Sequence, residues 1–244
     1  MPSEFDNFAN NYQDEAVSSL GIFGKYRNSS LSYKSEYLKH ILPYEPKGIL
    51  DFGCGIGLNI PYLRKNFPNT KLFGCDISQE SIKIAVSKNH FCDFNVITMV
   101  ENLEYYKNKI DVIFISGVFH HIPYPEHEKW VNGFYELMNS GNHLVIFEHN
   151  IKNPMTANIV KNSVIDMDAV MLDPKYCKML FNTRFFKAGI SKNGKGVKTV
   201  AVKNNIKLRY TYFFPWRVKL FLTMEYIFYF MPVGAQYCLS VEKL

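Results

Sequence analysis

The sequence predicts an α/β protein built on one mostly parallel β-sheet that helices cover on both faces. Three observations favour this class. Five short apolar runs between residues 48 and 147 alternate with amphipathic segments, the runs are apolar almost throughout, and a glycine-rich turn follows the first of them. Alternating strands and helices build βαβ units with a parallel sheet, and continuously apolar strands are typical of a sheet buried on both faces.

The predicted elements follow this alternation along the chain. The apolar runs predict strands over residues 48–52, 71–75, 94–98, 111–115 and 143–147. Helices are expected between them over residues 59–66, 78–89 and 126–138. Before the sheet, residues 4–20 and 31–42 are expected to be helical, and Pro43 and Pro46 end that region. We therefore predict an N-terminal helical cap, residues 1–42, on a domain of residues 43–244, the two forming one globular unit.

The last third of the chain mixes the apolar periodicity of helices with that of strands. We expect helices over residues 173–186, 197–204 and 216–231, with a loop over residues 191–196. Strands are expected over residues 207–214 and 235–241. The chain has 244 residues, a length that one α/β domain commonly reaches, and it contains no internal repeat.

The composition narrows the class of protein. Hydrophobic residues make up 47% of the chain and charged residues 20%, which is ordinary for a soluble globular protein. The five cysteines are widely spaced and form no C-x-x-C pair, which argues against a disulfide framework and favours the reducing cytoplasm. We also expect no signal peptide, because no basic region followed by an apolar run begins the sequence.

The formal net charge of +6 has a local origin. Residues 174–220 contain twelve Lys or Arg residues and no Asp or Glu. This run predicts an anionic partner or substrate, unless it is simply a solvated face. Residues 220–231 are apolar but shorter than the roughly 20 residues of a membrane span. Burial of that stretch against the sheet is favoured over contact with anionic lipid, and no nucleic-acid-binding signature is present.

A glycine-rich turn and an acidic residue mark a predicted nucleoside site. The turn, DFGCGIG at residues 51–57, leads from a strand into a helix N-terminus, where backbone N–H groups favour anionic ligands. Its spacing is G-x-G-x-G, and Leu58 stands where a dinucleotide fingerprint ends in glycine, which counts against NAD or FAD. Asp76 ends the second strand, where a carboxylate can accept both ribose hydroxyls of an adenosine. The alternative for Asp76 is an N-cap of the next helix.

Three stretches resemble the class I S-adenosylmethionine (SAM)-dependent methyltransferases. They are ILDFGCGIGLN at residues 49–59, CDIS at 75–78 and DVIFISGVFHHIP at 111–123. Residues 148–150, 153–154, 166–170 and 232–244 further resemble a bacterial small-molecule subgroup associated with polysaccharide and capsule biosynthesis. The resemblance covers nearly the whole chain. It implies a Rossmann-like fold with a mostly parallel seven-stranded sheet and an antiparallel last strand, and SAM as the cofactor.

The resemblance also implies which residues surround the cofactor. The glycine turn would face the methionine part, Asp76 would hold the ribose, Ser116 would border the sulfonium and Tyr12 would cap the cofactor. Relatives carry an acid after the third strand for the adenine amino group, and Thr98 or Glu101 would take that place here. The implied set is Tyr12, Asp51, Gly53, Cys54, Gly55, Gly57, Asn59, Asp76, Ile77, Thr98 and Ser116.

The catalytic candidates lie just past the fourth and fifth strands, at the sheet edge where open α/β sheets bind ligands. They are His120, His121, Glu148 and His149. Histidine titrates near neutral pH and so suits general-base work, and some sugar O-methyltransferases resemble this arrangement. The alternative is a histidine that only bonds the backbone at a turn. Glu126 and His127 lie close by in sequence, but the spacing fits no standard zinc site, so no metal is predicted.

These observations predict an enzyme that transfers a methyl group from SAM to a small-molecule acceptor, leaving S-adenosylhomocysteine (SAH). The favoured acceptor is a hydroxyl of a sugar, sugar phosphate or capsular precursor, with a phosphoramidate-type modification as a narrower form. An anionic or phosphate-bearing acceptor would fit the basic run. The alternatives are an N- or C-methyltransferase of another metabolite, lipid or quinone, and a catalytically silent SAM-binding partner. No pattern indicates the oligomeric state.

Overall fold

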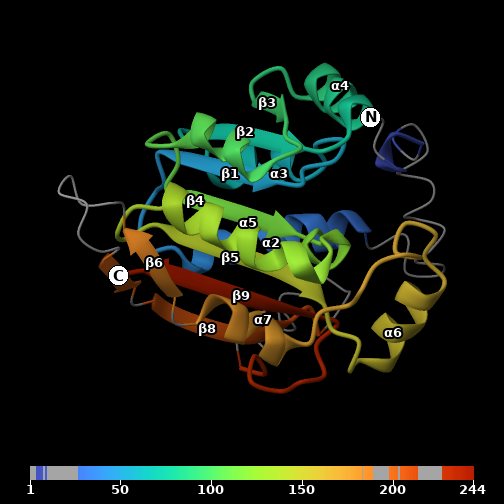
Figure 1. Cartoon of the computed structure of the whole chain (residues 1–244). Helices are drawn as coiled ribbons and strands as arrows, with labels where there is room; N and C mark the ends of the chain where they lie inside the picture. Colours follow the sequence, from blue (N-terminus) through green and yellow to red (C-terminus); the bar gives the residue numbers. More distant parts are fainter. Residues whose placement is uncertain are drawn as a thin grey trace.

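The computed structural model describes residues 4–7, 9, 27–182, 184–188, 198–202, 204–213 and 227–244. Its centre is a seven-stranded sheet of order β3-β2-β1-β4-β5-β9-β8 (Figure 1). The first five strands run parallel, whereas β9 is antiparallel to both of its neighbours, β5 and β8. The predicted fold class is therefore confirmed. The strands are β1 (Gly48–Phe52), β2 (Lys71–Asp76), β3 (Asp93–Val96), β4 (Val112–Ser116), β5 (His143–His149), β8 (Asn204–Thr211) and β9 (Gln236–Lys243).

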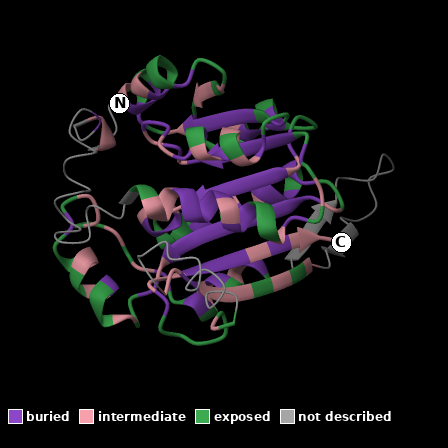
Figure 2. Cartoon of the chain, turned by 180° about the vertical axis from the view of Figure 1, so that it is seen from behind, coloured by how far each residue is buried: buried purple, intermediate pink, exposed green. Residues whose placement is uncertain are grey.

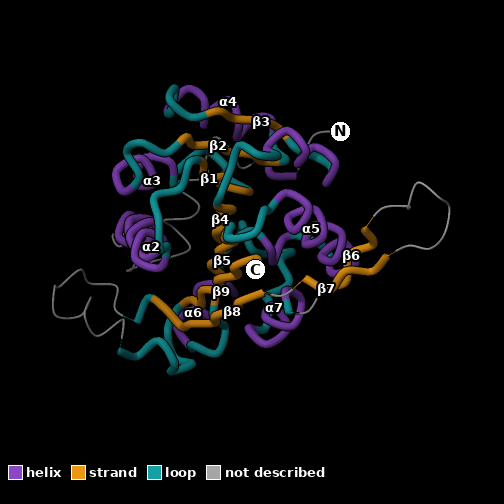
Figure 3. The backbone as a smooth tube through the Cα atoms, turned by 90° about the vertical axis from the view of Figure 1, so that its left-hand side faces the viewer, coloured by secondary structure: helices purple, strands orange, loops and turns teal. Residues whose placement is uncertain are grey.

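Helices cover both faces of this sheet (Figure 3). One face carries α2 (Arg27–Ile41) and α3 (Ile60–Asn66), and the other carries α5 (Tyr124–Leu137), α7 (Pro174–Phe181) and the 3-10 helix η3 (Val100–Tyr106). The remaining elements are η1 (Glu4–Asn7), α4 (Gln79–Lys88), η4 (Phe119–His121), α6 (Pro154–Lys161) and a separate hairpin of β6 (Arg184–Ala188) and β7 (Lys198–Val202).

The central strands are buried along most of their length, as Figure 2 shows. Successive side chains alternate between the two faces. Leu50 and Ile113 pack on the side of α5, while Ile49 and Phe114 pack on the side of α2. This double burial explains the nearly continuous apolar runs, because neither face of these strands meets water.

Helix α2 shares the core of the sheet. Tyr37 and Leu38 are buried, and the Tyr37 ring meets the Phe147 ring of β5 edge to face with centroids 5.8 Å apart. Helix α2 also contacts α3. Residues 10–26 lie outside the described part of the chain, so the predicted domain boundary at residue 42 stays a prediction.

Several predicted elements in the last third of the chain were wrong. Residues 198–202, expected to be helical, form β7, whose sequence KTVAV is rich in the β-branched residues that favour strands. The helix expected to reach residue 186 ends at Phe181, and β6 follows it. Residues 227–231 form turns instead of a helix end. The predicted loop 191–196 and most of the predicted helix 216–231 lie outside the described residues.

Two other predicted elements are displaced or shortened. The third strand covers Asp93–Val96 instead of residues 94–98, and β8 runs from Asn204 to Thr211 instead of over residues 207–214. Of the predicted helix 4–20, Glu4–Asn7 form one turn of 3-10 helix. None of the helices described is both long enough and apolar enough to cross a membrane.

Replacing Leu38 with alanine tests whether α2 belongs to the common core. Leu38 is fully buried, so the Leu38→Ala change should lower the free energy of unfolding by about 2–5 kcal/mol through lost burial and a residual cavity. Urea denaturation followed by circular dichroism measures it. Lys65→Ala, at an exposed position of α3, is the control and should stay within about 0.5 kcal/mol of wild type. Equal values for the two variants would mean that α2 is separable from the sheet.

Candidate active site

The glycine turn after β1 lies at the carboxyl edge of the sheet. Gly53, Gly55 and Gly57 all have positive φ angles, of 70°, 52° and 77°. A Cβ at Gly53 would come within 2.5 Å of the Val118 side chain, whereas a Cβ at Gly55 would meet no atom of the described part of the chain within 4 Å. The backbone at Gly55 therefore borders open space that a ligand can occupy closely.

Asp76 is directed at this turn from the end of β2. Its Oδ2 accepts a hydrogen bond from the Gly55 N–H at 2.8 Å, and its Oδ1 accepts one from the Ser78 N–H at 2.9 Å. Burial raises the pKa of the Asp76 carboxyl, although these backbone donors lower it. The N-cap of α4 is Ser78, whose Oγ accepts from the Ser81 N–H, so the helix-cap alternative for Asp76 is wrong.

Asp51 lies buried beneath the turn with an incomplete set of hydrogen bonds. The Asn59 side chain donates to its Oδ2 at 3.4 Å, while its Oδ1 has no hydrogen-bond partner among the described residues. Burial raises the pKa of Asp51 to about 7; the Asn59 hydrogen bond lowers it, nearby Asp76 raises it and Lys34 lowers it. A buried, unpartnered carboxylate oxygen is costly unless a ligand supplies the missing donor.

Lys34 is a site residue that the sequence analysis missed. It lies on α2, is buried, and its Nζ donates to the Ser116 Oγ at 2.7 Å, at the end of β4. Its charge also acts on the pKa values of Asp51 and His149. A single lysine in a polar helical segment carries no local signal that would distinguish it from a surface cation.

A buried acid and histidine pair joins the ends of β4 and β5. The Nδ1 of His120, in η4, lies 2.5 Å from Oε2 of Glu148, and the other oxygen of Glu148 accepts from the Phe119 N–H at 2.9 Å. Both side chains are about 1% exposed. This contact brings together two of the predicted catalytic residues.

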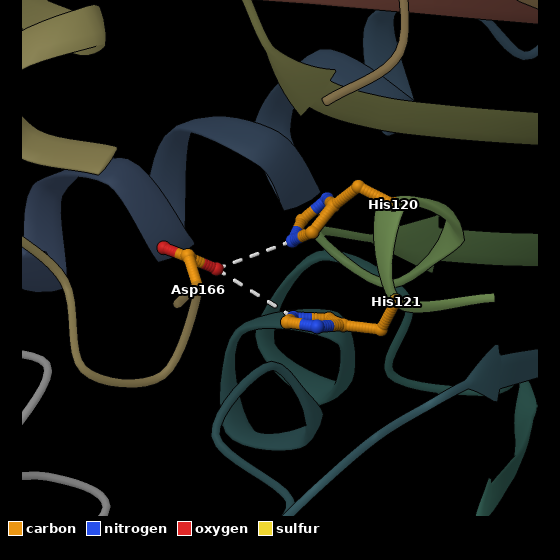
Figure 4. Close-up of side chains that lie close together, drawn as sticks. All are labelled: His120, His121 and Asp166. Atoms are coloured by element: carbon orange, nitrogen blue, oxygen red, sulfur yellow. Dashed lines mark hydrogen bonds and ion pairs between the residues drawn. The ribbon is translucent and has the colours of Figure 1, made fainter. Parts of the chain in front are cut away.

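Asp166 completes a cluster with both histidines of η4 (Figure 4). Its Oδ1 lies 3.3 Å from Nε2 of His120 and 3.5 Å from Nε2 of His121. The segment is held in place because the Val170 N–H donates to the His120 carbonyl oxygen at 2.9 Å. The role of Asp166 was not predicted, because it lies 46 residues from His120 in sequence.

The protonation states within this cluster differ. Burial alone would lower the pKa of His120, but the Glu148 and Asp166 carboxylates raise it to about 9. Burial lowers the pKa of His121 to about 4, and that of His149 likewise to about 4, with the His120 charge adding to both shifts. For Glu148 and Asp166, burial would raise the pKa, but His120 lowers both. At neutral pH an imidazolium thus lies between two carboxylates, beside two neutral imidazoles.

The remaining predicted cofactor residues differ in their positions. The buried Cys54 fills space beside Gly55, Thr98 is exposed, and Glu101 is exposed and lies 3.8 Å from the Lys129 ammonium. Ile77 is 49% exposed next to Asp76. Tyr12 lies outside the described residues.

The nearby candidates for metal ligation, Glu126 and His127, do not join the histidine cluster. The His127 ring is buried and held by the Tyr176 hydroxyl at 2.9 Å and the Ile122 carbonyl oxygen at 2.8 Å, and Glu126 is exposed. At the opposite end of the site, Asp6 of η1 accepts from the Ser78 hydroxyl at 2.6 Å and from the Glu80 N–H at 3.2 Å. The N-terminal segment therefore lies against the start of α4, which the sequence did not predict (Figure 1).

Sequence comparisons match this part of the chain to methyltransferases. Residues 50–144 match the family model described as a methyltransferase domain, which covers the region from β1 into β5. The ubiquinone biosynthesis O-methyltransferase of Hydrogenovibrio crunogenus is 28% identical over 133 residues, covering 51% of this chain and 52% of that protein. The tRNA U34 carboxymethyltransferase of Aliarcobacter butzleri is 30% identical over 113 residues, covering 42% and 37%. The chain thus spans about half, or less, of the curated relatives it matches.

Solved structures share the fold at low sequence identity. A SAM-dependent methyltransferase from Archaeoglobus fulgidus has a TM-score of 0.58 at 16% identity, covering 86% of this chain and 92% of that one. A plantazolicin methyltransferase in complex with SAH has a TM-score of 0.60 at 18% identity, covering 98% and 90%. Residues 50–144 thus resemble a methyltransferase domain, and the solved structures show that the chain shares the fold of SAM-dependent methyltransferases.

Replacing Asp76 tests the nucleoside site directly. Asp76→Ala removes the carboxylate at the end of β2, so SAH binding measured by calorimetry should weaken at least about 100-fold, the value of two charge-assisted hydrogen bonds. Asp93→Ala, an exposed acid on the neighbouring edge strand β3, is the matched control and should bind SAH like wild type. NAD should not bind either protein. Unchanged SAH affinity in a folded Asp76→Ala protein would contradict the assignment.

Proposed function

We propose that the protein is a SAM-dependent methyltransferase that methylates a hydroxyl group of a small-molecule acceptor. The observation that carries this proposal is the unpartnered Oδ1 of Asp51 beside the open backbone at Gly55, with Asp76 at the end of the adjacent strand. Along this edge lie a buried carboxylate, a turn whose backbone a ligand can approach closely, and a second carboxylate. A cationic amino acid joined to a nucleoside would meet these three features in this order.

The residues fit each part of SAM. Asp51 Oδ1 would accept a hydrogen bond from the ammonium of the methionine part, and the Lys34 ammonium supplies a cation for its carboxylate. Asp76 keeps lone pairs for the ribose hydroxyls, because each oxygen accepts only one hydrogen bond among the described residues. The exposed side chains of Ile77 and Met99 offer apolar surface to the adenine. Thr98, Ser116 and Tyr12 remain proposed contacts.

Bound SAM supplies an electrophilic methyl group on a sulfonium. The protein must then align the acceptor oxygen with that methyl and remove its proton. We assign the base role to His149, at the end of β5. Among the described residues nothing hydrogen-bonds its ring, which lies against the His120 ring with centroids 5.5 Å apart. His120 has both nitrogens engaged by Glu148 and Asp166, so it orients the cluster instead.

The proposed acceptor is a sugar, a sugar phosphate or a capsular precursor, methylated in the cytoplasm. The sequence resemblance to the polysaccharide-associated subgroup supports this choice. The twelve cations and absence of acids over residues 174–220 fit a phosphate-bearing acceptor, including a phosphoramidate-type group. The match to an O-methyltransferase supports oxygen as the accepting atom.

Asp51 should make SAH binding pH-dependent. Its pKa is about 7 in the free protein because of burial, and a cation placed beside Oδ1 lowers it, so the complex holds fewer protons. The affinity for SAH should therefore rise about tenfold from pH 6 to pH 8, with proton release measurable by calorimetry in buffers of different ionisation enthalpy. The Asp51→Asn protein should lose this dependence. Asp76 is present in both proteins, so its own titration cancels in the comparison. Identical pH profiles of SAH affinity for the wild type and the Asp51→Asn protein would contradict the role assigned to Asp51.

An acceptor screen with labelled SAM tests the reaction. We expect transfer to sugars or sugar phosphates, and a loss of about 10²–10⁴-fold in kcat for His149→Ala, as for removal of a general base. SAH binding by the same variant should stay within about threefold of wild type. Transfer to a quinol or to tRNA, with none to any sugar, would overturn the acceptor proposal. Equal kcat values for wild type and His149→Ala would overturn the role of His149.

A further inference from the structure

Three metal-ligating side chains converge at the carboxyl edge of β4 (Figure 4). We propose that His120, His121 and Asp166 bind a divalent transition-metal ion, with zinc the best fit. The sequence predicted no metal because the spacing of the histidine pair with Glu126 and His127 fits no standard zinc site, and Asp166 was not among those candidates.

The separations match those of a metal site. Asp166 Oδ1 lies 3.3 Å from His120 Nε2 and 3.5 Å from His121 Nε2, and all three ligand atoms lie within 4.8 Å of one another. Tetrahedral zinc with bonds of about 2.0–2.2 Å separates its ligand atoms by about 3.4 Å. An ion can therefore enter this triangle with only small movements of the side chains.

The His121 ring meets the Phe5 ring edge to face and lies against the His120 ring, with centroids 5.2 and 4.2 Å apart. At 3.5 Å its contact with Asp166 is at the outer limit of a hydrogen bond, and His120 already donates to the same oxygen. Yet both Nε2 atoms are directed at that one oxygen (Figure 4). Two imidazole nitrogens and a carboxylate oxygen arranged around a common point form a usual zinc ligand set, whereas Mg²⁺ prefers oxygen ligands alone.

The surroundings of His120 are those of a metal ligand. Its Nδ1 bonds Glu148, which is itself fixed by the Phe119 N–H. Its Nε2 is directed at the proposed ion and would release its proton when the ion binds. Such a carboxylate behind a ligating histidine sets the ring orientation in metal sites. Glu148 would thus orient the His120 ring toward the ion, a role that it would not have if His120 only bonded the backbone at a turn.

The site is closed on one side and open on the other. The His120 side chain is about 1% exposed, whereas those of Asp166 and His121 are 12% and 16% exposed. Three protein ligands leave the fourth position of a tetrahedral ion to water or to a substrate oxygen. If the proposed methyl transfer holds, an acceptor hydroxyl bound there would be polarised by the ion and more readily deprotonated.

Metal binding can be measured without any activity assay. The full chain, free of affinity tags and stripped with a chelator, is titrated with Zn²⁺ by calorimetry and with Co²⁺ by its visible absorption. We expect one equivalent of each ion to bind, with the Co²⁺ band intensity of a tetrahedral complex. His121→Ala and Asp166→Ala should each weaken Zn²⁺ binding at least about 100-fold, and Glu148→Gln about 10–100-fold.

Matched controls separate this site from surface ligands. His90→Ala and Asp168→Ala remove exposed side chains of the same types and should bind Zn²⁺ like wild type. Circular dichroism confirms the fold of each variant; His121 is used because it is less buried than His120 and its loss is better tolerated. Absence of stoichiometric binding in the folded wild type, or equal affinity in His121→Ala and His90→Ala, would overturn the proposal.

The same proteins distinguish this proposal from the proposed methyl transfer. SAH affinity is measured in parallel, and His121→Ala should retain it, because none of the proposed SAM contacts involves His121. Stoichiometric Zn²⁺ binding in a protein that binds no SAH would support the metal site and overturn the cofactor assignment. SAH binding in a protein that takes up no Zn²⁺ would support the cofactor assignment and overturn the metal site.

Discussion

Glu148 lies at the end of β5 with both carboxylate oxygens buried, and each oxygen accepts a hydrogen bond from the turn after β4. A buried carboxylate without partners would be strongly destabilising, so this pairing fixes where η4 can lie. Because η4 also accepts the Val170 N–H through the His120 carbonyl, the segment that carries Asp166 is fixed with it. The positions of the two histidines and Asp166 relative to one another thus depend on the buried Glu148 carboxylate.

Polarity is distributed unevenly along the sheet. The middles of β1, β4 and β5 are apolar and buried on both faces, and they supply the hydrophobic stabilisation. The buried charged groups gather instead at the carboxyl edge, among them Asp51, Lys34 and Glu148. Within the described part of the chain, Oδ1 of Asp51 lacks a hydrogen-bond partner there. A buried carboxylate oxygen that lacks a donor is suited to binding a cationic ligand group.

The sequence predicted β1, β2, β4 and β5 well because each is a short, mostly apolar run closed by a turn, a pattern decided within a few residues. The less apolar β3 was displaced by comparison. It also predicted Asp76 and the histidine pair, which occupy fixed places at strand ends. It missed Lys34 and Asp166, which reach the site only through contacts across 82 and 46 residues of sequence. The β6 and β7 hairpin was missed for the opposite reason, since its local pattern also suited a helix until strand pairing decided it.

The position of β9 has a consequence for the order of assembly. Among the described strands β8 pairs with β9 alone, although β9 is the later of the two in the chain. During synthesis on the ribosome, β1 to β5 can therefore associate first, leaving β5 as an open edge and β8 without a partner. The nascent chain must keep that edge from pairing with other molecules until residues 236–243 emerge. Slow translation of this last stretch would prolong exposure to aggregation and would increase the need for chaperones.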